Sequence, residues 1–368
     1  MNRFAAEGFV FSSFESFAPL PTRSHDKGRA RRAAAASGDR PRDGDSSTLN
    51  DGRMRAVRIT AEGHVYKTTS LRAAPVLDIP ASTLARAAGS SGAASAGPGT
   101  RRGLTVFGQD DRVEITDPNV TPYMAIGQLT FDVADPAAGG AQETYVCTGT
   151  LVGTDAVLTA AHCVFDQETN DWVDATAFYP ARSLDALGGT VDPYGGFGVV
   201  YRTVYSAWSD GSVDDPFPYD IAVLRLAPSA STGASAFDTV GYFMGVLGDV
   251  CALPESFAVV GYPGSGGGDM FDSGACSDAQ GHYQCGDDML DTNCDWVGGN
   301  SGGPAVTLID GNAQVMGVVS HHVGPASALS TASSSAWLNG DAYNTLTMMN
   351  AAKFADIYTW MTEPVPQA

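Results

Sequence analysis

The sequence predicts an all-β fold for residues 104–368, and two observations carry this prediction. Short segments rich in β-branched and aromatic residues recur along this region, with Gly, Pro, Asp and Asn between them. Many short strands at such a spacing are typical of a barrel or a sandwich. Helical periodicity is sparse and is clearest at the end of the chain. The strands that we expect are 125–133, 144–152, 156–159, 197–204, 221–226, 257–260, 305–308 and 315–320.

Residues 351–361 are expected to form one C-terminal helix. Phe354, Ile357, Tyr358 and Met361 are spaced so that a helix places them on one face. We therefore predict that this helix packs on the β architecture through that face.

The first 103 residues have a different composition, rich in Ala, Arg, Ser, Gly and Asp. Such a segment cannot bury enough apolar surface to fold, so we expect it to be largely disordered. Alternating residues between 54 and 79 indicate one or two strands of a small pro-segment fold. The dibasic pair Arg101-Arg102 marks the boundary and is a candidate processing site.

Charge is distributed unevenly between these two regions. Residues 1–103 carry 16 of the 21 Lys and Arg and 9 of the 41 Asp and Glu, a net charge of +7, and the remainder carries −27. A strongly acidic domain is a poor partner for nucleic acid, so we expect none. The opposite charges suggest that the pro-segment is itself a partner, held partly by charge. No run of about 18 apolar residues occurs, and a membrane-spanning helix is therefore not expected.

Cysteine usage indicates an oxidising compartment. Six cysteines all follow residue 140, an even number that fits three disulfides. We therefore expect an extracellular or periplasmic protein, although no clear signal peptide is visible. A zinc site is the alternative, but its residues lack the tight Cys pairs of structural zinc sites, so no metal and no cofactor are expected. The zinc alternative would use Cys276, His282, Cys285 and Cys294.

Three short strings supply candidate catalytic groups: TAAHC at 159–163, YDIAVL at 219–224 and GGNSGGP at 298–304. Serine is a weak nucleophile at neutral pH, so Ser301 needs a base that removes its proton as it attacks a carbonyl. His162 is the candidate base, because a pKa near ~6.5 lets it accept and return a proton. Asp220 would orient the imidazole and stabilise its charged form.

The glycines around Ser301 allow a sharp backbone bend. We expect the N–H groups of Gly299 and Ser301 to converge on the oxyanion that forms during attack. The string also satisfies the G-x-S-x-G pattern of α/β-hydrolases, but that fold requires Asp and then His after the serine. The order His, Asp, Ser belongs instead to double β-barrel enzymes.

On these residues the chain resembles the chymotrypsin-fold (trypsin-like) serine proteases, and most of all their bacterial glutamyl endopeptidase (V8-like) branch. Further similarity lies in VFGQDDR at 106–112, AIGQL at 125–129 and VGYPG at 260–264. The resemblance implies two antiparallel six-stranded β-barrels, 104–232 with His162 and Asp220, and 233–368 with Ser301. It also implies a serine endopeptidase that forms an acyl-enzyme on Ser301.

The resemblance further implies a disulfide between Cys147 and Cys163 that closes the loop carrying His162. The four remaining cysteines allow three connectivities, and we favour a bond from Cys294 that braces the loop before Ser301. One departure from the animal branch is Asn300, where those enzymes have an Asp that pairs with the new N-terminus. In the V8-like branch the freed N-terminus still helps to shape the substrate pocket, so removal of residues 1–103 is expected to matter.

The candidate substrate-binding residues indicate two different substrate specificities. Asp295 stands six residues before Ser301, where trypsin-like enzymes carry the carboxylate that selects Arg or Lys. Ser320, His321 and His322 match the strand that lines the primary pocket, where glutamyl-specific relatives place a histidine. A histidine beside a substrate carboxylate favours acidic side chains. The sequence leaves both specificities open.

We expect the partners to be protein or peptide substrates and the chain's own pro-segment, and the protein to be a monomer. The alternative to an enzyme is a catalytically silent protease homologue that acts as a secreted binding module. Such homologues normally lack a member of the triad, whereas His162, Asp220 and Ser301 are all present here.

Overall fold

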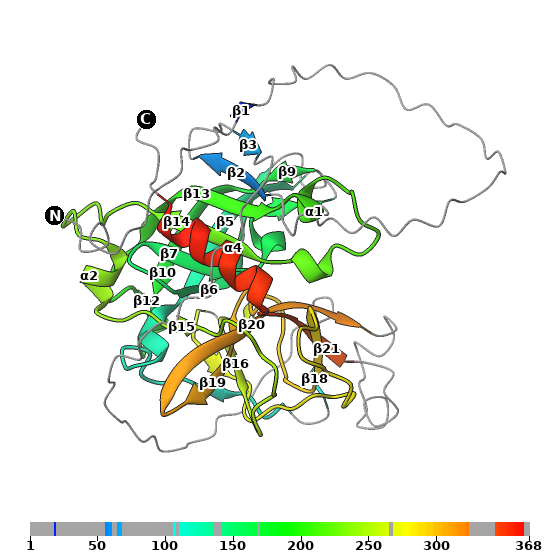
Figure 1. Cartoon of the computed structure of the whole chain (residues 1–368). Helices are drawn as coiled ribbons and strands as arrows, with labels where there is room; N and C mark the ends of the chain where they lie inside the picture. Colours follow the sequence, from blue (N-terminus) through cyan, green and yellow to red (C-terminus); the bar gives the residue numbers. More distant parts are fainter. Residues whose placement is uncertain are drawn as a thin grey trace, which may run out of the picture.

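The computed structural model describes residues 18–19, 56–60, 65–67, 106–107, 110–135, 141–167, 170–264, 268–323 and 343–363. Strands dominate these residues, which confirms the predicted all-β fold, and they form two lobes with one long helix between them (Figure 1). Most of the predicted pro-segment and its dibasic site lie outside the described residues. Its predicted disorder therefore stays a prediction.

The first lobe is a closed antiparallel barrel. Its strands follow the order β13-β10-β5-β6-β7-β14, and pairing of β13 with β14 completes the ring. Alternating apolar residues fill the interior, and Leu129, Phe178 and Leu224 are fully buried there. The strands are β5 (Ile126–Asp135), β6 (Ala141–Leu151), β7 (Ala156–Thr159), β10 (Asp174–Pro180), β13 (Phe197–Tyr205) and β14 (Ala222–Leu226).

The second lobe is an eight-stranded sheet in which β18-β21-β20-β19-β16-β17-β4 are adjacent and β15 pairs with β20. Two more strands than expected are present, because the two-residue strands β4 and β15 join the sheet. Its own core includes Trp296, Met316 and Leu346. The strands are β4 (Val113–Glu114), β15 (Gly245–Val246), β16 (Ala258–Gly261), β17 (Phe271–Asp272), β18 (Met289–Thr292), β19 (Pro304–Ile309), β20 (Asn312–Val323) and β21 (Tyr343–Met348).

The C-terminal helix α4 (Ala351–Thr362) forms as predicted and lies across the molecule between the lobes (Figure 1). Its predicted buried face is only partly right. Ile357 is buried, but Phe354, Tyr358 and Met361 are half-buried, and the helix instead buries Lys353, Ala355, Asp356 and Trp360. A hydrophobicity pattern assigns Lys and Asp to solvent, whereas here both are buried against partners from other elements. No helix in the described part of the chain is long and apolar enough to cross a membrane.

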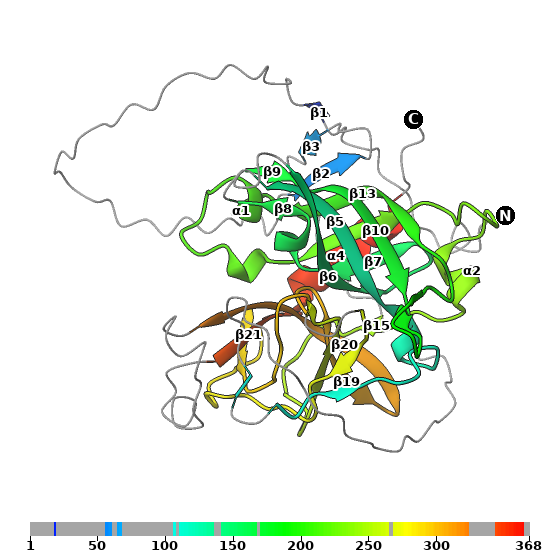
Figure 2. The same cartoon turned by 180° about the vertical axis from the view of Figure 1, so that it is seen from behind.

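The predicted strands at 54–79 exist, but they do not form a separate small fold. They are β2 (Ala56–Thr60) and β3 (Val65–Lys67), and β2 pairs antiparallel with β13 of the first barrel. The two-residue strand β1 (Ala18–Pro19) pairs with β3. Figure 2 shows these strands at the outer edge of the first lobe. The described part of the N-terminal segment therefore extends the sheet of the barrel.

The structure also contains strands that the pattern did not predict, and the longest of them are β10, β18 and β21. In β21 the buried residues include Asn344, Thr345 and Thr347, so the strand is polar in composition although it lies inside. The remaining elements are short: β8 (Phe165–Asp166), β9 (Asp171–Trp172), β11 (Ser183–Leu184), β12 (Thr190–Val191), α1 (Ser206–Ser209), α2 (Ala236–Val240), η2 (Tyr123–Ala125), η3 (Ala161–Cys163) and η4 (Phe217–Tyr219).

Candidate active site

His162 and Asp220 meet at the ends of two neighbouring strands of the first barrel. His162 lies in η3, directly after β7, and Asp220 ends η4, directly before β14. Asp220 is fully buried; its Oδ2 lies 2.8 Å from His162 Nδ1, and its Oδ1 accepts a hydrogen bond of 2.9 Å from the His162 amide. One carboxylate therefore holds both the ring and the backbone of the histidine. With the Nδ1 proton directed at Asp220, Nε2 carries the free lone pair.

Electrostatics keeps this pair in the state that a base requires. Burial alone raises the pKa of Asp220, but His162 and the Ser320 hydroxyl stabilise the carboxylate and bring its pKa below the ordinary value. Burial lowers the pKa of His162, but the charge and hydrogen bond of Asp220 outweigh burial, so the net pKa is raised. Asp220 is therefore ionised at neutral pH and strengthens His162 as a proton acceptor.

Ser301 is held in place by β6, through Thr148. The Thr148 amide donates to the Ser301 carbonyl at 2.8 Å, and the Thr148 hydroxyl donates to the Gly299 carbonyl at 2.8 Å. The same hydroxyl accepts from the Tyr262 amide at 2.9 Å. A single buried threonine thus braces the loop on both sides of Asn300. Thr148 was missed by sequence reasoning, because nothing in the local pattern marks a strand threonine as a support for a loop 151 residues away.

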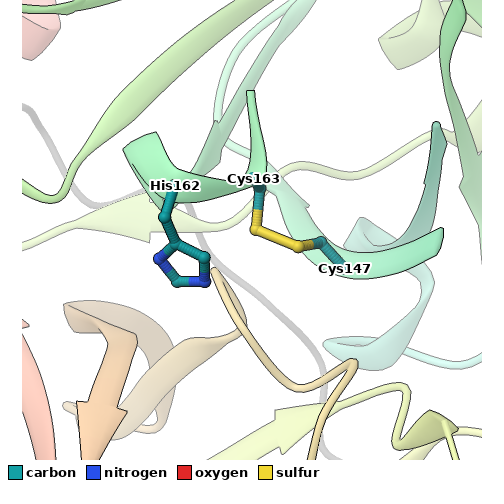
Figure 3. Close-up of side chains that lie close together, drawn as sticks. All are labelled: Cys147, His162 and Cys163. Carbon is teal, nitrogen blue, oxygen red and sulfur yellow. A yellow bond between two sulfur atoms is a disulfide. The ribbon is translucent and has the colours of Figure 1, made fainter. Parts of the chain in front are cut away.

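The Cys147–Cys163 disulfide joins the two halves of this arrangement (Figure 3). Cys147 precedes Thr148, and Cys163 follows His162. The Ser301 carbonyl oxygen lies 3.6 Å from the Cys163 sulfur, which places the serine backbone against the turn that carries the histidine. The disulfide implied by the resemblance is therefore present, and it ties the turn of His162 to the strand that holds Ser301.

Two glycines shape the loop around Ser301. Gly299 and Gly302 have φ of +101° and +76°, and a Cβ atom would collide with the Tyr262 carbonyl at the first and with Thr159 at the second. Within the part of the chain that the structure describes, the N–H groups of Gly299 and Ser301 donate to no protein acceptor. These two backbone donors lie on either side of Asn300 in the chain.

Comparison with known proteins bears on this site. Residues 147–318 match the family described as "Trypsin-like peptidase domain", a span that contains His162, Asp220 and Ser301. The chain is therefore similar to the trypsin-like peptidases over this span. It is 26% identical over 160 residues to the glutamyl endopeptidase of Bacillus licheniformis, which covers 44% of this chain and 42% of that protein. It is 29% identical over 154 residues to a Bacillus subtilis protein named extracellular metalloprotease, which covers 40% of this chain and 45% of that protein.

The chain thus spans less than half the length of the curated relatives that it matches. Among solved structures, "Structure of Glu endopeptidase in complex with MPD" aligns with a TM-score of 0.50 and 22% identity, and covers 70% of this chain and all of that one. At this identity the alignment supports the fold alone. The predicted resemblance to the chymotrypsin-fold serine proteases and to their glutamyl endopeptidase branch is confirmed.

Ser320 and His321 continue the hydrogen-bond network of Asp220. The Ser320 hydroxyl donates to Asp220 Oδ2 at 2.6 Å and lies 3.1 Å from His321 Nδ1. The His321 ring stacks on Phe217, with 3.7 Å between ring centroids. Burial lowers the pKa values of both His321 and His322, so both are neutral near pH 7. Both neutral imidazoles thus lie in β20, directly after Ser320.

Asp295 lies in a different environment from the histidines of β20. Its side chain is 4% exposed, and its Oδ1 accepts a hydrogen bond of 2.6 Å from the Phe107 amide. Burial, together with the nearby Asp111 and Asp110 carboxylates, raises the pKa of Asp295 to about 7. The carboxylate is therefore engaged by the backbone of a segment 188 residues earlier in the chain.

The remaining cysteines form Cys276–Cys294 and Cys251–Cys285. The favoured bond from Cys294 is therefore present, and it links the residue directly before Asp295 to Cys276. Cys276, Cys285 and Cys294 of the zinc alternative are all in disulfides, so they offer no thiolate to a metal.

Trp208 is a further neighbour of His162 that the sequence did not predict. It is buried, and its ring centroid lies 6.4 Å from that of His162.

Proposed function

We propose that this chain is a serine endopeptidase that acts through an acyl-enzyme on Ser301. The observation that carries the proposal is the buried, ionised Asp220, which binds both the ring and the amide of His162 beside the Ser301 loop. His162 Nε2 would take the Ser301 proton as Oγ attacks a peptide carbonyl. The N–H groups of Gly299 and Ser301 would stabilise the oxyanion.

The second half of the reaction uses the same groups. His162 gives its proton to the leaving amine, the C–N bond breaks, and an ester to Ser301 remains. His162 then removes a proton from water, which attacks the ester and releases the acid product and the Ser301 hydroxyl. The substrates are proteins or peptides. Three disulfides support action outside the cytoplasm.

The test is covalent labelling with a fluorophosphonate probe, read by intact-mass and peptide mass spectrometry. We expect one label per chain, on Ser301, and none in Ser301→Ala or His162→Ala. Ser301→Ala should also lower kcat on a peptide substrate by on the order of 10⁶-fold. Ser229→Ala, a buried serine outside the site, should label like the parent chain. Absence of labelling in both the full and the trimmed parent chain would support the silent homologue instead.

We further propose that the substrate residue preceding the cut is acidic rather than basic. Asp295 accepts a hydrogen bond from the Phe107 amide, so its carboxylate is not free to select Arg or Lys. The neutral His322 can donate its ring N–H to a substrate carboxylate, whereas the N–H of the neutral His321 faces the Ser320 hydroxyl oxygen. The named relative from Bacillus licheniformis, a glutamyl endopeptidase, points the same way.

Fluorogenic peptides that differ only at this residue, with Glu, Gln or Arg, measure the preference. We expect the highest kcat/KM for Glu. In Asp295→Asn, which keeps an oxygen acceptor for Phe107, the ratio of Arg to Gln cleavage should not change. Faster cleavage of the Arg peptide, lost in Asp295→Asn, would show that Asp295 selects a basic side chain after all.

A further inference from the structure

We infer that the β2–β3 hairpin binds the first barrel by strand addition and stays bound after the chain is cut between the hairpin and residue 106. In the following, the hairpin means β2 (Ala56–Thr60) with β3 (Val65–Lys67). All five residues of β2 pair with β13, from Ala56 opposite Tyr205 to Thr60 opposite Tyr201. The hairpin is therefore attached along a complete ladder.

The edge that receives β2 is created by the barrel itself. β13 pairs with β10 only at its start, through residues 197 and 198, and then the two strands diverge. Its other edge pairs with β14 from residue 199 to 204. Residues 201–205 would consequently present free N–H and C=O groups on one side if β2 were absent. Such an unpaired edge is a template for another strand, and β2 fills it.

The hairpin also contributes to the core of the barrel. Ala56 has no exposed surface and belongs to the same apolar cluster as Val204 and Tyr205. Figure 1 shows β2 beside β13, with β3 on its outer side. The contact thus combines backbone pairing with burial of apolar surface, and both survive a break in the chain far from the ladder.

The strand that pairs with β2 is followed by α1, which packs beside the candidate base His162. β13 ends at Tyr205, and α1 follows at Ser206 and also contacts β2. In α1, Trp208 donates to the Phe165 carbonyl at 3.3 Å and packs beside His162. The Trp208 carbonyl accepts from Gln167 at 2.6 Å. The bound hairpin therefore supports β13, the strand that positions α1 beside His162. The hairpin pairs with β13 and not with the Ser301 loop.

A strand ladder predicts a different salt dependence from the charge attraction expected from the sequence. Attraction between a +7 segment and a −27 domain weakens as salt screens it. Backbone hydrogen bonds and the burial of Ala56 are not screened in this way. Salt therefore distinguishes the two kinds of attachment.

The experiment uses the full chain with Ser301→Ala, so that any activity of its own cannot cut the hairpin. A recognition sequence for a site-specific protease replaces residues 96–100, and the chain is cut there. Size-exclusion chromatography and native mass spectrometry follow, at about 50 mM and about 1 M NaCl. We expect the N-terminal fragment to remain with the peptidase domain at both salt concentrations. Separation at either concentration would overturn the inference, and separation only at high salt would assign the attachment to charge.

A proline variant tests the ladder itself. Ile59 is paired on both sides, with Arg202 of β13 and Val65 of β3, so Ile59→Pro removes an N–H from a two-sided strand. The matched control Ile59→Ala keeps that N–H. We expect the retained fragment to fall at least tenfold in Ile59→Pro and to stay unchanged in Ile59→Ala.

Hydrogen exchange on the uncut chain gives a second readout. The amides of residues 201–205 should exchange slowly in the parent chain and in Ile59→Ala. Those that face β2 should lose protection in Ile59→Pro, while the amides of β7 stay protected, which shows that the barrel itself is folded. Retention of the fragment and of protection in Ile59→Pro would contradict attachment through this ladder.

Discussion

Asp220 is the residue on which the candidate site depends most. An ionised carboxylate without exposed surface is costly unless every oxygen is satisfied. Here three donors meet it: the His162 amide, the His162 ring and the Ser320 hydroxyl. The contacts that stabilise the buried charge also fix the orientation of the His162 ring, so the stability of the fold and the proposed mechanism require the same residue at this position.

The raised pKa of His162 has a measurable consequence. Catalysis needs the neutral imidazole, so kcat/KM should rise with pH through an apparent pKa above the ordinary ~6.5 and then level off. Asp220→Asn removes the charge and should lower the pKa of His162, with a loss of about 10⁴-fold in kcat. NMR titration of the imidazole nitrogens measures the first effect independently of turnover. An unchanged His162 titration in Asp220→Asn would argue against the pairing.

At the scale of elements, β6 connects the loops that carry His162 and Ser301. It pairs with β5 along ten residues, and near its end it carries Cys147 and Thr148. The disulfide from Cys147 reaches the His162 turn, and the hydrogen bonds of Thr148 reach the Ser301 loop. A strand that is rigid through its own pairing thus transmits that rigidity to both loops.

Removing the Cys147–Cys163 disulfide should therefore affect both stability and catalysis. Cys147→Ser with Cys163→Ser opens a loop with a sequence separation of 16, which costs about 3 kcal/mol of unfolding free energy in the chain-entropy model. Urea unfolding measures this cost, and kcat/KM should fall as well. The control is Cys251→Ser with Cys285→Ser, an exposed pair on the second lobe. It should lose stability but keep its kcat/KM; equal kinetic losses in both variants would show that only overall stability matters.

At the scale of the whole molecule, β4 and the C-terminal helix α4 connect the two lobes. β4 comes from the start of the domain but pairs with β17 of the second lobe. In α4, Lys353 pairs with Asp288 at 2.9 Å, whereas Asp356 accepts from Tyr205 of the first barrel at 3.2 Å. The helix thus contacts both lobes and fixes the relation between the halves that carry His162 and Ser301.

The buried Asp356 makes this contact depend on pH. Burial raises its pKa to about 7, whereas an unfolded Asp titrates near ~3.9. The folded state therefore favours the protonated form, and stability is lost as pH rises from about 4 through about 7. Asp356→Asn should be more stable than the parent at pH 8.5, by on the order of 2 kcal/mol, and the difference should shrink as pH falls toward about 4. Urea unfolding across this range measures it; a constant difference would contradict the titration.

The sequence by itself determined what depends on local order along the chain. The amino-acid sequence itself specifies the identities and the order of His162, Asp220 and Ser301. The strands with a strong local signal follow from short runs of apolar and β-branched residues, as β7 does with Ala-Val-Leu-Thr at 156–159. The family resemblance then extended these facts to the double barrel and to one disulfide.

Only the tertiary structure decided how distant segments meet. The local sequence pattern does not predict that Asp295 accepts a hydrogen bond from the Phe107 amide. It also does not predict that Lys353 and Asp356 are buried in α4, or that β2 pairs with β13. The contacts of Asp295, Asp356 and β2 join residues more than a hundred positions apart, and Lys353 reaches Asp288, 65 positions away. Each of these polar side chains is buried only because its partner comes from another part of the fold. Local periodicity records the average environment of a residue, whereas the fold decides which partner is there to satisfy it.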